Sequence, residues 1–330
     1  MTSAATSGLG LPVGLLLSDT GSDGPVLPAD RPRFYELCTA DGVRYEQIAT
    51  LHDSDVLVST VLATCPRYEV SQRCRFCAID TSAIDTSANG ESSRYPGTTP
   101  TTLAVRSASD LAEVAEAAVR LDGARQMVLT AGPSLGLSEG PSLGPSLEPD
   151  RSALHLARCV RAVTAAVPGL PVQVQIEPPG DLMSISALRR AGATTIGVSV
   201  YSLDDEVRKC WMPGRSTVSL SRYWAAWDEA VRVFGRNRVF TSLVLGLGDS
   251  PDDLVDAARL LIERGVHPLV VPLRPAAGTV AAADGFTAPA AEVLADVTAR
   301  VAGLLTAAEM RWAGRHGFYG ACSAMAVSGG

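Results

Sequence analysis

Three cysteines lie in one short segment, and their spacing is the clearest sign of chemistry in this chain. Cys65, Cys74 and Cys77 follow the apolar run 56–63, and the residues between them are mostly charged or polar. The thiols are therefore expected on a loop rather than in a core, which favours a role as metal ligands. Three thiolates can hold three irons of a [4Fe-4S] cluster and leave the fourth iron open to a small molecule that offers an amine and a carboxylate.

Zinc is the main alternative for this segment. The Cys74-x-x-Cys77 spacing suits tetrahedral zinc, but structural zinc sites usually draw their ligands as two close pairs, and a second pair is missing here. His52 or Cys38 could complete such a site. The cysteines that carry no spacing signal are interpreted as core or incidental residues: Cys38, Cys159, Cys210 and Cys322.

Length and composition limit the kind of protein. The chain has 330 residues, 46% of them hydrophobic, which suits one barrel-sized domain. A net charge of -7 without a long Lys/Arg run argues against a nucleic-acid partner and favours a small-molecule substrate. No stretch reads as a signal peptide or a membrane span, and free cysteines suit a reducing compartment. We therefore expect a cytoplasmic protein without a membrane partner; the sequence does not indicate its oligomeric state.

Short apolar runs alternate with longer amphipathic segments along most of the chain. The expected strands are 56–63, 126–130, 172–176, 195–201, 239–247 and 269–273. The expected helices are 109–121, 152–167, 183–191, 223–234, 251–264 and 290–307. Strands separated by helices run parallel, so about six βα units predict an α/β protein with a partial or full (β/α) barrel. We expect a lead-in segment of low complexity over 1–50, the barrel core over 51–280, and a helical extension with a tail over 281–330.

Unusual residues follow the expected strands, where a barrel of this kind binds its ligands. They are the cysteine loop, Thr130-Ala131-Gly132, Glu177, Ser199 with Tyr201, Gly246 with Gly248, and Arg274. Each residue alone also has a plain structural interpretation, since glycines turn chains and Glu177 can simply face solvent. Their gathering at one edge favours a functional site.

The cysteine loop with Phe76 between its last two cysteines, followed by this βα pattern, resembles the radical SAM superfamily over about residues 56 to 275. Glu177-Pro-Pro, the segment 244–248 and the segment 271–275 are most similar to biotin-synthase-like bacterial proteins encoded near nitrilases. One departure stands out. The usual spacing is Cys-x3-Cys-x2-Cys, whereas eight residues separate Cys65 from Cys74 here.

The resemblance implies a set of ligands for the cluster and for S-adenosylmethionine (SAM). Cys65, Cys74 and Cys77 would ligate the cluster, and Phe76 would lie near the adenine. Thr130, Ala131 and Gly132 stand where the family has a Gly-Gly-Glu-like strand end that meets the methionyl amine, but the Glu is lacking.

The remaining strand-end residues are assigned on the same resemblance. Glu177, Ser199 and Tyr201 could reach the ribose or the substrate, and Arg215 could pair with the methionyl carboxylate. Gly246 and Gly248 would let the backbone approach the adenine. Arg274 is the candidate to bind an anionic group, because a guanidinium offers a bidentate fork to a carboxylate.

The implied reaction is a reductive cleavage of SAM. The reduced cluster, fed by a reductant such as flavodoxin or ferredoxin, would give one electron to the sulfonium, and the resulting 5'-deoxyadenosyl radical would take hydrogen from a small-molecule substrate. Transfer of the aminocarboxypropyl part of SAM is the alternative within this class. A non-catalytic zinc or iron-sulfur protein and a metal-free barrel enzyme are the alternatives outside it.

Two segments look like duplications. Ala-Ile-Asp-Thr-Ser occurs at 78–82 and again at 83–87, and Gly-Pro-Ser-Leu begins at residues 132, 140 and 144. This composition favours loops, and the second repeat is expected beside the ligand site as a lid or a simple loop expansion. The segment 317–325 could cover one end of the barrel, and Cys322 alone does not make a second cluster.

Overall fold

The computed structural model describes residues 31–52, 55–62, 65, 67, 71–77, 105–131 and 148–311. Their strands form one seven-stranded sheet in which spatial order follows chain order. The strands are β1 (Thr50–His52), β2 (Val56–Leu62), β3 (Gln126–Ala131), β4 (Val172–Ile176), β5 (Thr195–Val198), β6 (Val239–Leu245) and β7 (His267–Pro272). β1 is antiparallel to β2, whereas β2 to β7 are all parallel. The predicted α/β fold with six parallel strands is confirmed.

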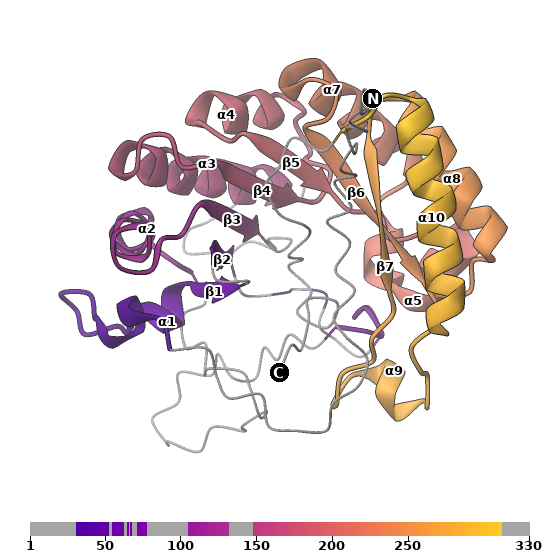
Figure 1. Ribbon diagram of the computed structural model, residues 1–330, viewed down its shortest axis with the longest axis horizontal. Helices are drawn as coiled ribbons and strands as arrows, with labels where there is room; N and C mark the ends of the chain where they lie inside the picture. Colours follow the sequence, from indigo (N-terminus) through magenta and orange to yellow (C-terminus); the bar gives the residue numbers. More distant parts are fainter. Residues whose placement is uncertain are drawn as a thin grey trace, which may run out of the picture.

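Helices flank the curved sheet, most of them on its outer side, as Figure 1 shows. In chain order they are η1 (Arg33–Glu36), α1 (Tyr45–Ile48), α2 (Ala108–Asp122), α3 (Glu148–Ala166), α4 (Met183–Ala191), α5 (Asp205–Trp211), α6 (Pro213–Ser216), α7 (Leu220–Phe234), α8 (Pro251–Glu263), α9 (Val280–Ala283) and α10 (Ala291–Ala307). Within the described residues β1 and β7 remain the two edges of the sheet, so the barrel is a partial one.

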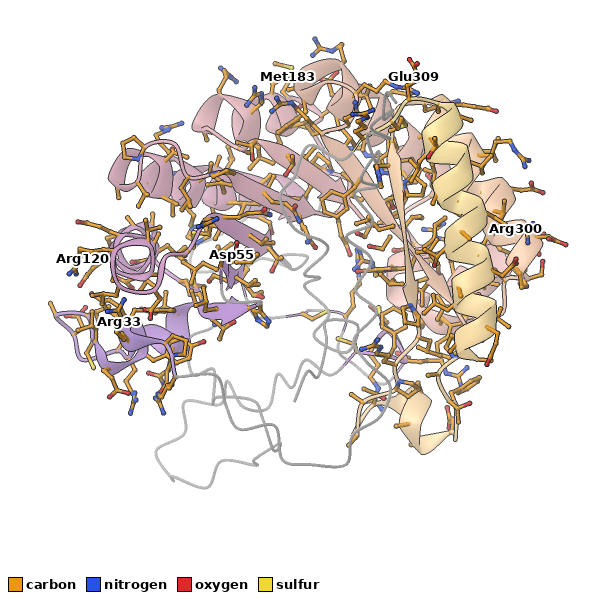
Figure 2. All side chains as sticks on the ribbon, viewed as in Figure 1. Arg33, Asp55, Arg120, Met183, Arg300 and Glu309 are labelled. Atoms are coloured by element: carbon orange, nitrogen blue, oxygen red, sulfur yellow. The ribbon has the colours of Figure 1, made fainter. Side chains whose placement is uncertain are left out.

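The long helices begin at side chains that satisfy their free backbone amides. The hydroxyl of Ser107 accepts from the amide of Asp110 and caps α2, which begins at Ala108, one residue earlier than the sequence predicts. Ser250 and Asp253 form a reciprocal capping box at α8, and Pro251 occupies its first turn. Each helix then places an apolar stripe against the sheet, while charged residues such as Arg120 and Arg300 lie on the outer side of α2 and α10 (Figure 2).

The two faces of the sheet differ in chemistry. Met127 and Leu129 of β3 belong to the apolar core that the strands share with the helices. Side chains alternate along a strand, so the residues between them point to the inner face. Many of these inner residues are buried and polar: Gln126, Thr130, Gln173, Gln175, Thr195, Ser199, Ser242 and His267. An inner face of this kind suits a site that binds polar ligands rather than a solid apolar core.

Several boundaries differ from those predicted. β5 ends at Val198 because its pairing with β6 shifts by one residue, from Gly197 opposite Phe240 to Tyr201 opposite Leu243, and Tyr201 has a positive φ of 74°. The antiparallel strand β1 and the short helices α5, α6 and α9 were not predicted, since segments of three to seven residues carry little periodicity. By contrast, β4 and α4 have the predicted bounds. No helix in the described part of the chain is long and apolar enough to cross a membrane.

Gly197, in the middle of β5, allows Phe240 to fill the inner side of the sheet. A methyl group at residue 197 would lie 2.2 Å from the Phe240 ring. We expect Gly197→Ala to lower the free energy of unfolding by about 1 to 3 kcal/mol. In α10, Gly303 has no neighbour that a methyl would meet within 4 Å. Gly303→Ala should therefore raise the free energy of unfolding by about 0.5 to 1 kcal/mol. Urea unfolding of both variants distinguishes steric crowding from helix propensity.

His267 predicts a dependence of stability on pH. Burial lowers its pKa from 6.5 to about 4. Below pH 6.5 the unfolded chain binds a proton that the folded protein does not take up until about pH 4, so stability is lost as pH falls through this window. The loss attributable to His267 is up to about 3 kcal/mol. His267→Gln should remove it, and parallel unfolding curves of both proteins between pH 7 and pH 4 would contradict the assignment.

Candidate functional site

The cysteine loop is fixed to segments that lie far from it in the sequence. Gly214 of α6 donates its amide to the Gln72 carbonyl at 3.0 Å. The Arg75 amide donates to the Trp211 carbonyl at 2.8 Å, and the Arg75 carbonyl accepts from Ala281 at 2.8 Å. A Cβ at Gly214 would stand 2.6 Å from the Gln72 carbonyl oxygen, so only glycine permits this approach. The loop is therefore seated by backbone contacts on α5, α6 and α9.

The Arg75 side chain adds a second set of contacts. Its guanidinium lies 5.2 Å from the ring centres of both Trp211 and Phe286 and donates to Asp284 at 2.6 Å and to the Cys210 sulfur at 3.4 Å. The hydrogen bond to Asp284 raises the pKa of Arg75 despite some burial. These contacts hold the loop between α5 and α9.

Cys74 and Cys77 flank a single turn. The Cys77 amide donates to the Cys74 carbonyl at 3.0 Å. Between them, Phe76 is fully buried in an apolar cluster with Tyr201, Trp211, Leu247, Leu273 and other residues. The ring of Phe76 meets that of Tyr201 edge to face at 5.6 Å. Two of the three predicted thiols thus lie on one turn whose aromatic residue is fixed in the core.

Beside this turn, two arginines share one carboxylate. Arg67 Nη1 lies 2.8 and 2.7 Å from the two carboxylate oxygens of Glu177, and Arg215 Nε lies 3.3 Å from one of them. The side chains of Arg67, Arg215 and Glu177 are 20%, 13% and 13% exposed. Burial acts to lower the pKa of Arg215, but Glu177 and nearby tyrosines outweigh it and raise the pKa well above its usual value. Arg215 therefore stays charged in a largely buried position.

Tyr201 and Ser199 complete the surroundings of Arg215. Its guanidinium lies 4.8 Å above the Tyr201 ring and donates to the Ser199 carbonyl at 3.3 Å. Tyr201 continues the sheet after β5 by exchanging backbone hydrogen bonds with Ser242 and Val244 of β6. The positive φ at Tyr201 turns its ring toward Phe76, and the Ser199 hydroxyl lies 3.3 Å from that of Ser242.

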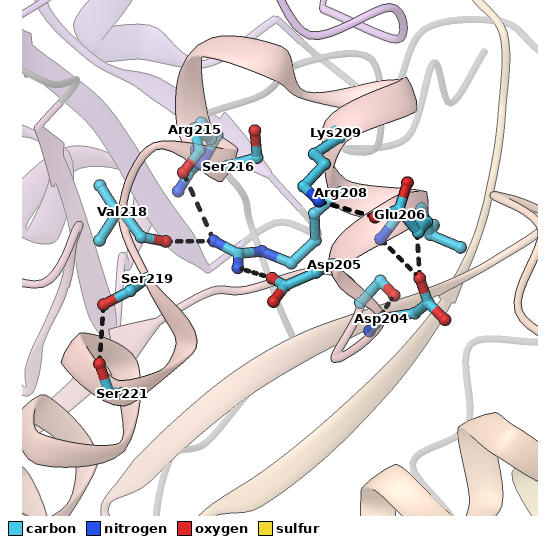
Figure 3. A network of polar contacts seen from close by, with 12 residues as sticks. Asp204, Asp205, Glu206, Arg208, Lys209, Arg215, Ser216, Val218, Ser219 and Ser221 are labelled. Carbon is cyan, nitrogen blue, oxygen red and sulfur yellow. Dashed lines mark hydrogen bonds and ion pairs between the residues drawn. The ribbon is translucent and has the colours of Figure 1, made fainter.

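A buried arginine organises the segment that carries Arg215. Arg208 donates to Asp205 at 2.8 Å, to the Val218 carbonyl at 2.5 Å and to the Arg215 carbonyl at 3.4 Å, as Figure 3 shows. Its side chain is 1% exposed and lies over the Tyr223 ring at 5.2 Å. One guanidinium thus joins α5 to the carbonyl groups of Arg215 and Val218.

The other predicted site residues are arranged less closely. Thr130 donates to the Thr60 hydroxyl at 3.0 Å at the end of β3, and Ala131 ends that strand. Gly246 and Gly248 have φ of 107° and 130°, which favours glycine. Arg274 is exposed and has no ion pair among the described residues. Gly132, the Gly-Pro-Ser-Leu repeats, the 78–87 duplication and Cys322 lie outside the described residues.

The structure therefore brings together Cys74, Phe76, Glu177, Ser199, Tyr201 and Arg215. Sequence reasoning missed Arg67 and Arg208. A run of arginines on a polar loop resembles ordinary surface charge, and Arg208 lies on a helix too short for a periodic pattern. In the described part of the chain no three His, Cys, Asp or Glu side chains lie close enough to hold a metal ion. The donors fit a cluster in kind, because cysteine thiolates are the usual ligands of iron-sulfur clusters and Cys74 lies near the charged Arg215. In position, Cys74 and Cys77 share one turn, and Cys65 does not complete a group of three with them.

Comparison with known families decides the class of protein. The family model described as the radical SAM superfamily matches residues 70–261, which include Cys74 and Cys77 and more than half of the chain. The chain belongs to the radical SAM superfamily. It is thus an enzyme of radical SAM type, and members of this superfamily use a [4Fe-4S] cluster and SAM.

The similar proteins are distant. A probable dual-specificity RNA methyltransferase RlmN from Salinispora tropica is 23% identical over 258 residues, covering 74% of this chain and 63% of that protein. Its namesake from Parafrankia is 29% identical over 129 residues, 38% of this chain and 34% of that one. The chain thus spans less than two thirds of these relatives. The hydrogenase maturase HydG of Carboxydothermus hydrogenoformans shares the fold, with a TM-score of 0.52 and 16% identity over 78% of this chain and 53% of its own.

Proposed function

We propose that this radical SAM enzyme holds its [4Fe-4S] cluster through Cys65, Cys74 and Cys77 and acts on a small anionic substrate. The observation that supports the proposal most directly is the seating of the cysteine loop beside the Arg215–Glu177 pair at the carboxyl ends of the strands. When bound, the cluster supplies the electron that cleaves SAM to methionine and a 5'-deoxyadenosyl radical, which removes hydrogen from the substrate.

The protein residues around the loop would bind and orient SAM. Arg215 would pair with the methionyl carboxylate, since it is charged and held over the Tyr201 ring. Phe76 and Tyr201 would border the adenine, and the buried ring of Phe76 would help exclude water from the site. Glu177 and Ser199 lie close enough to Arg215 to contact the ribose or the substrate.

The strand ends on either side would add backbone contacts. Residues 130 to 132 would meet the methionyl amine, and the positive φ of Gly246 and Gly248 would let β6 approach the adenine. Arg274, exposed beyond the end of β7, would bind an anionic group of the substrate. Flavodoxin or ferredoxin would serve as the reductant.

We retain the similarity to the biotin-synthase-like group as the proposed subgroup, with a barrel core over 51–280 between the flanks 1–50 and 281–330. The described parts of both flanks contribute to the barrel's core, since Phe34 and Tyr45 on one side and Val297 and Val301 on the other are buried in it. The flanks would therefore stabilise the core.

RNA is the second candidate substrate, because the two relatives are named as RNA methyltransferases. Against it, the chain has 35 acidic and 28 basic residues, and nucleic-acid binding needs clustered positive charge. Binding of RNA with an affinity that falls steeply as salt is raised would favour this candidate over a small molecule.

Anaerobic reconstitution tests the cluster and the cleavage together. We expect about four irons and four sulfides per chain, as for one [4Fe-4S] cluster. The reduced enzyme should convert SAM to 5'-deoxyadenosine and methionine, measured by mass analysis of the nucleoside. Cys74→Ala should lose both cluster and product, whereas Cys159→Ala, which removes a buried thiol in α3, should retain them.

Two outcomes would contradict this assignment in different ways. Stoichiometric zinc without iron uptake would indicate that the cysteines form a structural zinc site and not a cluster site. Enzyme-dependent 5'-methylthioadenosine as the main nucleoside would retain the cluster but replace hydrogen abstraction by aminocarboxypropyl transfer.

Arg274 is testable through the substrate that it would bind. Arg274→Ala should weaken transition-state stabilisation by about 2 to 4 kcal/mol, and Arg274→Lys by less, because lysine keeps the charge without the bidentate fork. The measurement is 5'-deoxyadenosine formation stimulated by a small-molecule extract, with iron content as the control. Unchanged stimulation of 5'-deoxyadenosine formation in Arg274→Ala would show that Arg274 does not bind the substrate.

A further inference from the structure

Arg67 comes from the part of the cysteine loop that departs from the usual spacing. It lies in the eight-residue interval between Cys65 and Cys74, and its Nη1 contacts both carboxylate oxygens of Glu177, at 2.8 and 2.7 Å. Glu177 directly follows β4, 110 residues further along the chain. The longer interval thus brings a cation across to the end of a distant strand.

The stem of Arg67 is seated on Gly214, next to Arg215. A Cβ at Gly214 would lie 2.9 Å from Arg67 Cδ and 3.0 Å from its Cβ, so the stem passes directly over the glycine. The Gly214 amide also donates to the Gln72 carbonyl of the same loop. Arg67 therefore has a defined path over α6 and is not a freely placed side chain.

The charges at this place do not balance. Two guanidinium groups share one carboxylate, so the group of three carries one net positive charge while it is largely buried. Arg67 contacts both oxygens of Glu177 at shorter distances than Arg215 contacts one, so the charge of Glu177 is divided between the two guanidinium groups. One unit of positive charge is left in the group of three for another anion.

We propose that Arg67 is a positioning residue that holds Glu177 and thereby leaves Arg215 free to bind the carboxylate of SAM. This inference rests on the proposed function of Arg215. Without Arg67, the Glu177 carboxylate would turn wholly to Arg215 and form a neutral pair. An incoming carboxylate would then have to compete with a carboxylate that is already in place.

A double-mutant cycle tests the charge balance. Arg67→Gln should raise the dissociation constant of SAM about tenfold or more, the effect expected for loss of a charge-assisted contact. Arg67→Gln combined with Glu177→Gln restores one net positive charge at Arg215, so it should bind SAM more tightly than Arg67→Gln does. Glu177→Gln alone completes the cycle and measures any contact of Glu177 with the ribose separately. Calorimetric SAM binding to metal-free and reconstituted protein measures this directly, and Arg300→Gln, far from the site on α10, is the matched control.

Hydrogen exchange separates charge balance from a fault in the loop. In the metal-free protein, exchange over residues 71–77 should rise in Arg67→Gln and stay raised in the double variant, although SAM affinity recovers. Unchanged SAM affinity in Arg67→Gln, or an equal loss in the single and double variants, would overturn the positioning role while leaving the proposed function intact. If the wild-type protein binds SAM neither in the metal-free nor in the reconstituted form, both the positioning role of Arg67 and the proposed function are overturned.

Discussion

The parallel arrangement of six strands gives the two faces of the sheet and its carboxyl edge different functions in the structure. The inner strands β3 to β6 have a neighbour on each side and are buried along their whole length, so one face needs an apolar cover, which the helices provide. The inner face instead carries amides and hydroxyls such as Gln175 and Ser242. Because all carboxyl ends meet at one edge, every loop that follows a strand lies within reach of the same ligand. The position of the site follows from topology before any particular residue is considered.

The cysteine loop cannot hold itself at this edge by hydrophobic burial, because it is largely polar. Its one large apolar residue among those described, Phe76, is buried completely, and the rest of the loop depends on directional contacts. Backbone hydrogen bonds tie it to α5, α6 and α9, and Arg67 and Arg75 each find a carboxylate on a different element. The described residues of the loop, fixed at these separate points, lose their conformational freedom on folding, so little of it remains to be lost when a ligand binds.

Much of this arrangement could be predicted from the sequence, and the limit has a physical cause. Strands and helices can be predicted from the periodic spacing of their apolar residues, which is why β4 and α4 have their predicted bounds. The placing of Glu177, Ser199 and Tyr201 at one edge followed from parallel topology. The contact between Arg67 and Glu177 could not be predicted, since it joins residues 110 positions apart and depends on space above Gly214. Contacts of this kind depend on three-dimensional packing, and they leave no repeating pattern in a single sequence.

The buried arginines show how the protein reserves positive charge for its site. Arg208 is paired with Asp205 and with backbone carbonyls, and the partly exposed Arg75 is paired with Asp284. Arg106, whose pKa burial lowers to about 10, remains protonated at neutral pH and directs its donors to the carbonyls of residues 47, 48 and 60. At Glu177, in contrast, two arginines share one carboxylate. A protein of net charge -7 thus keeps a local excess of positive charge beside its cysteine loop, where an anionic ligand gains most from it.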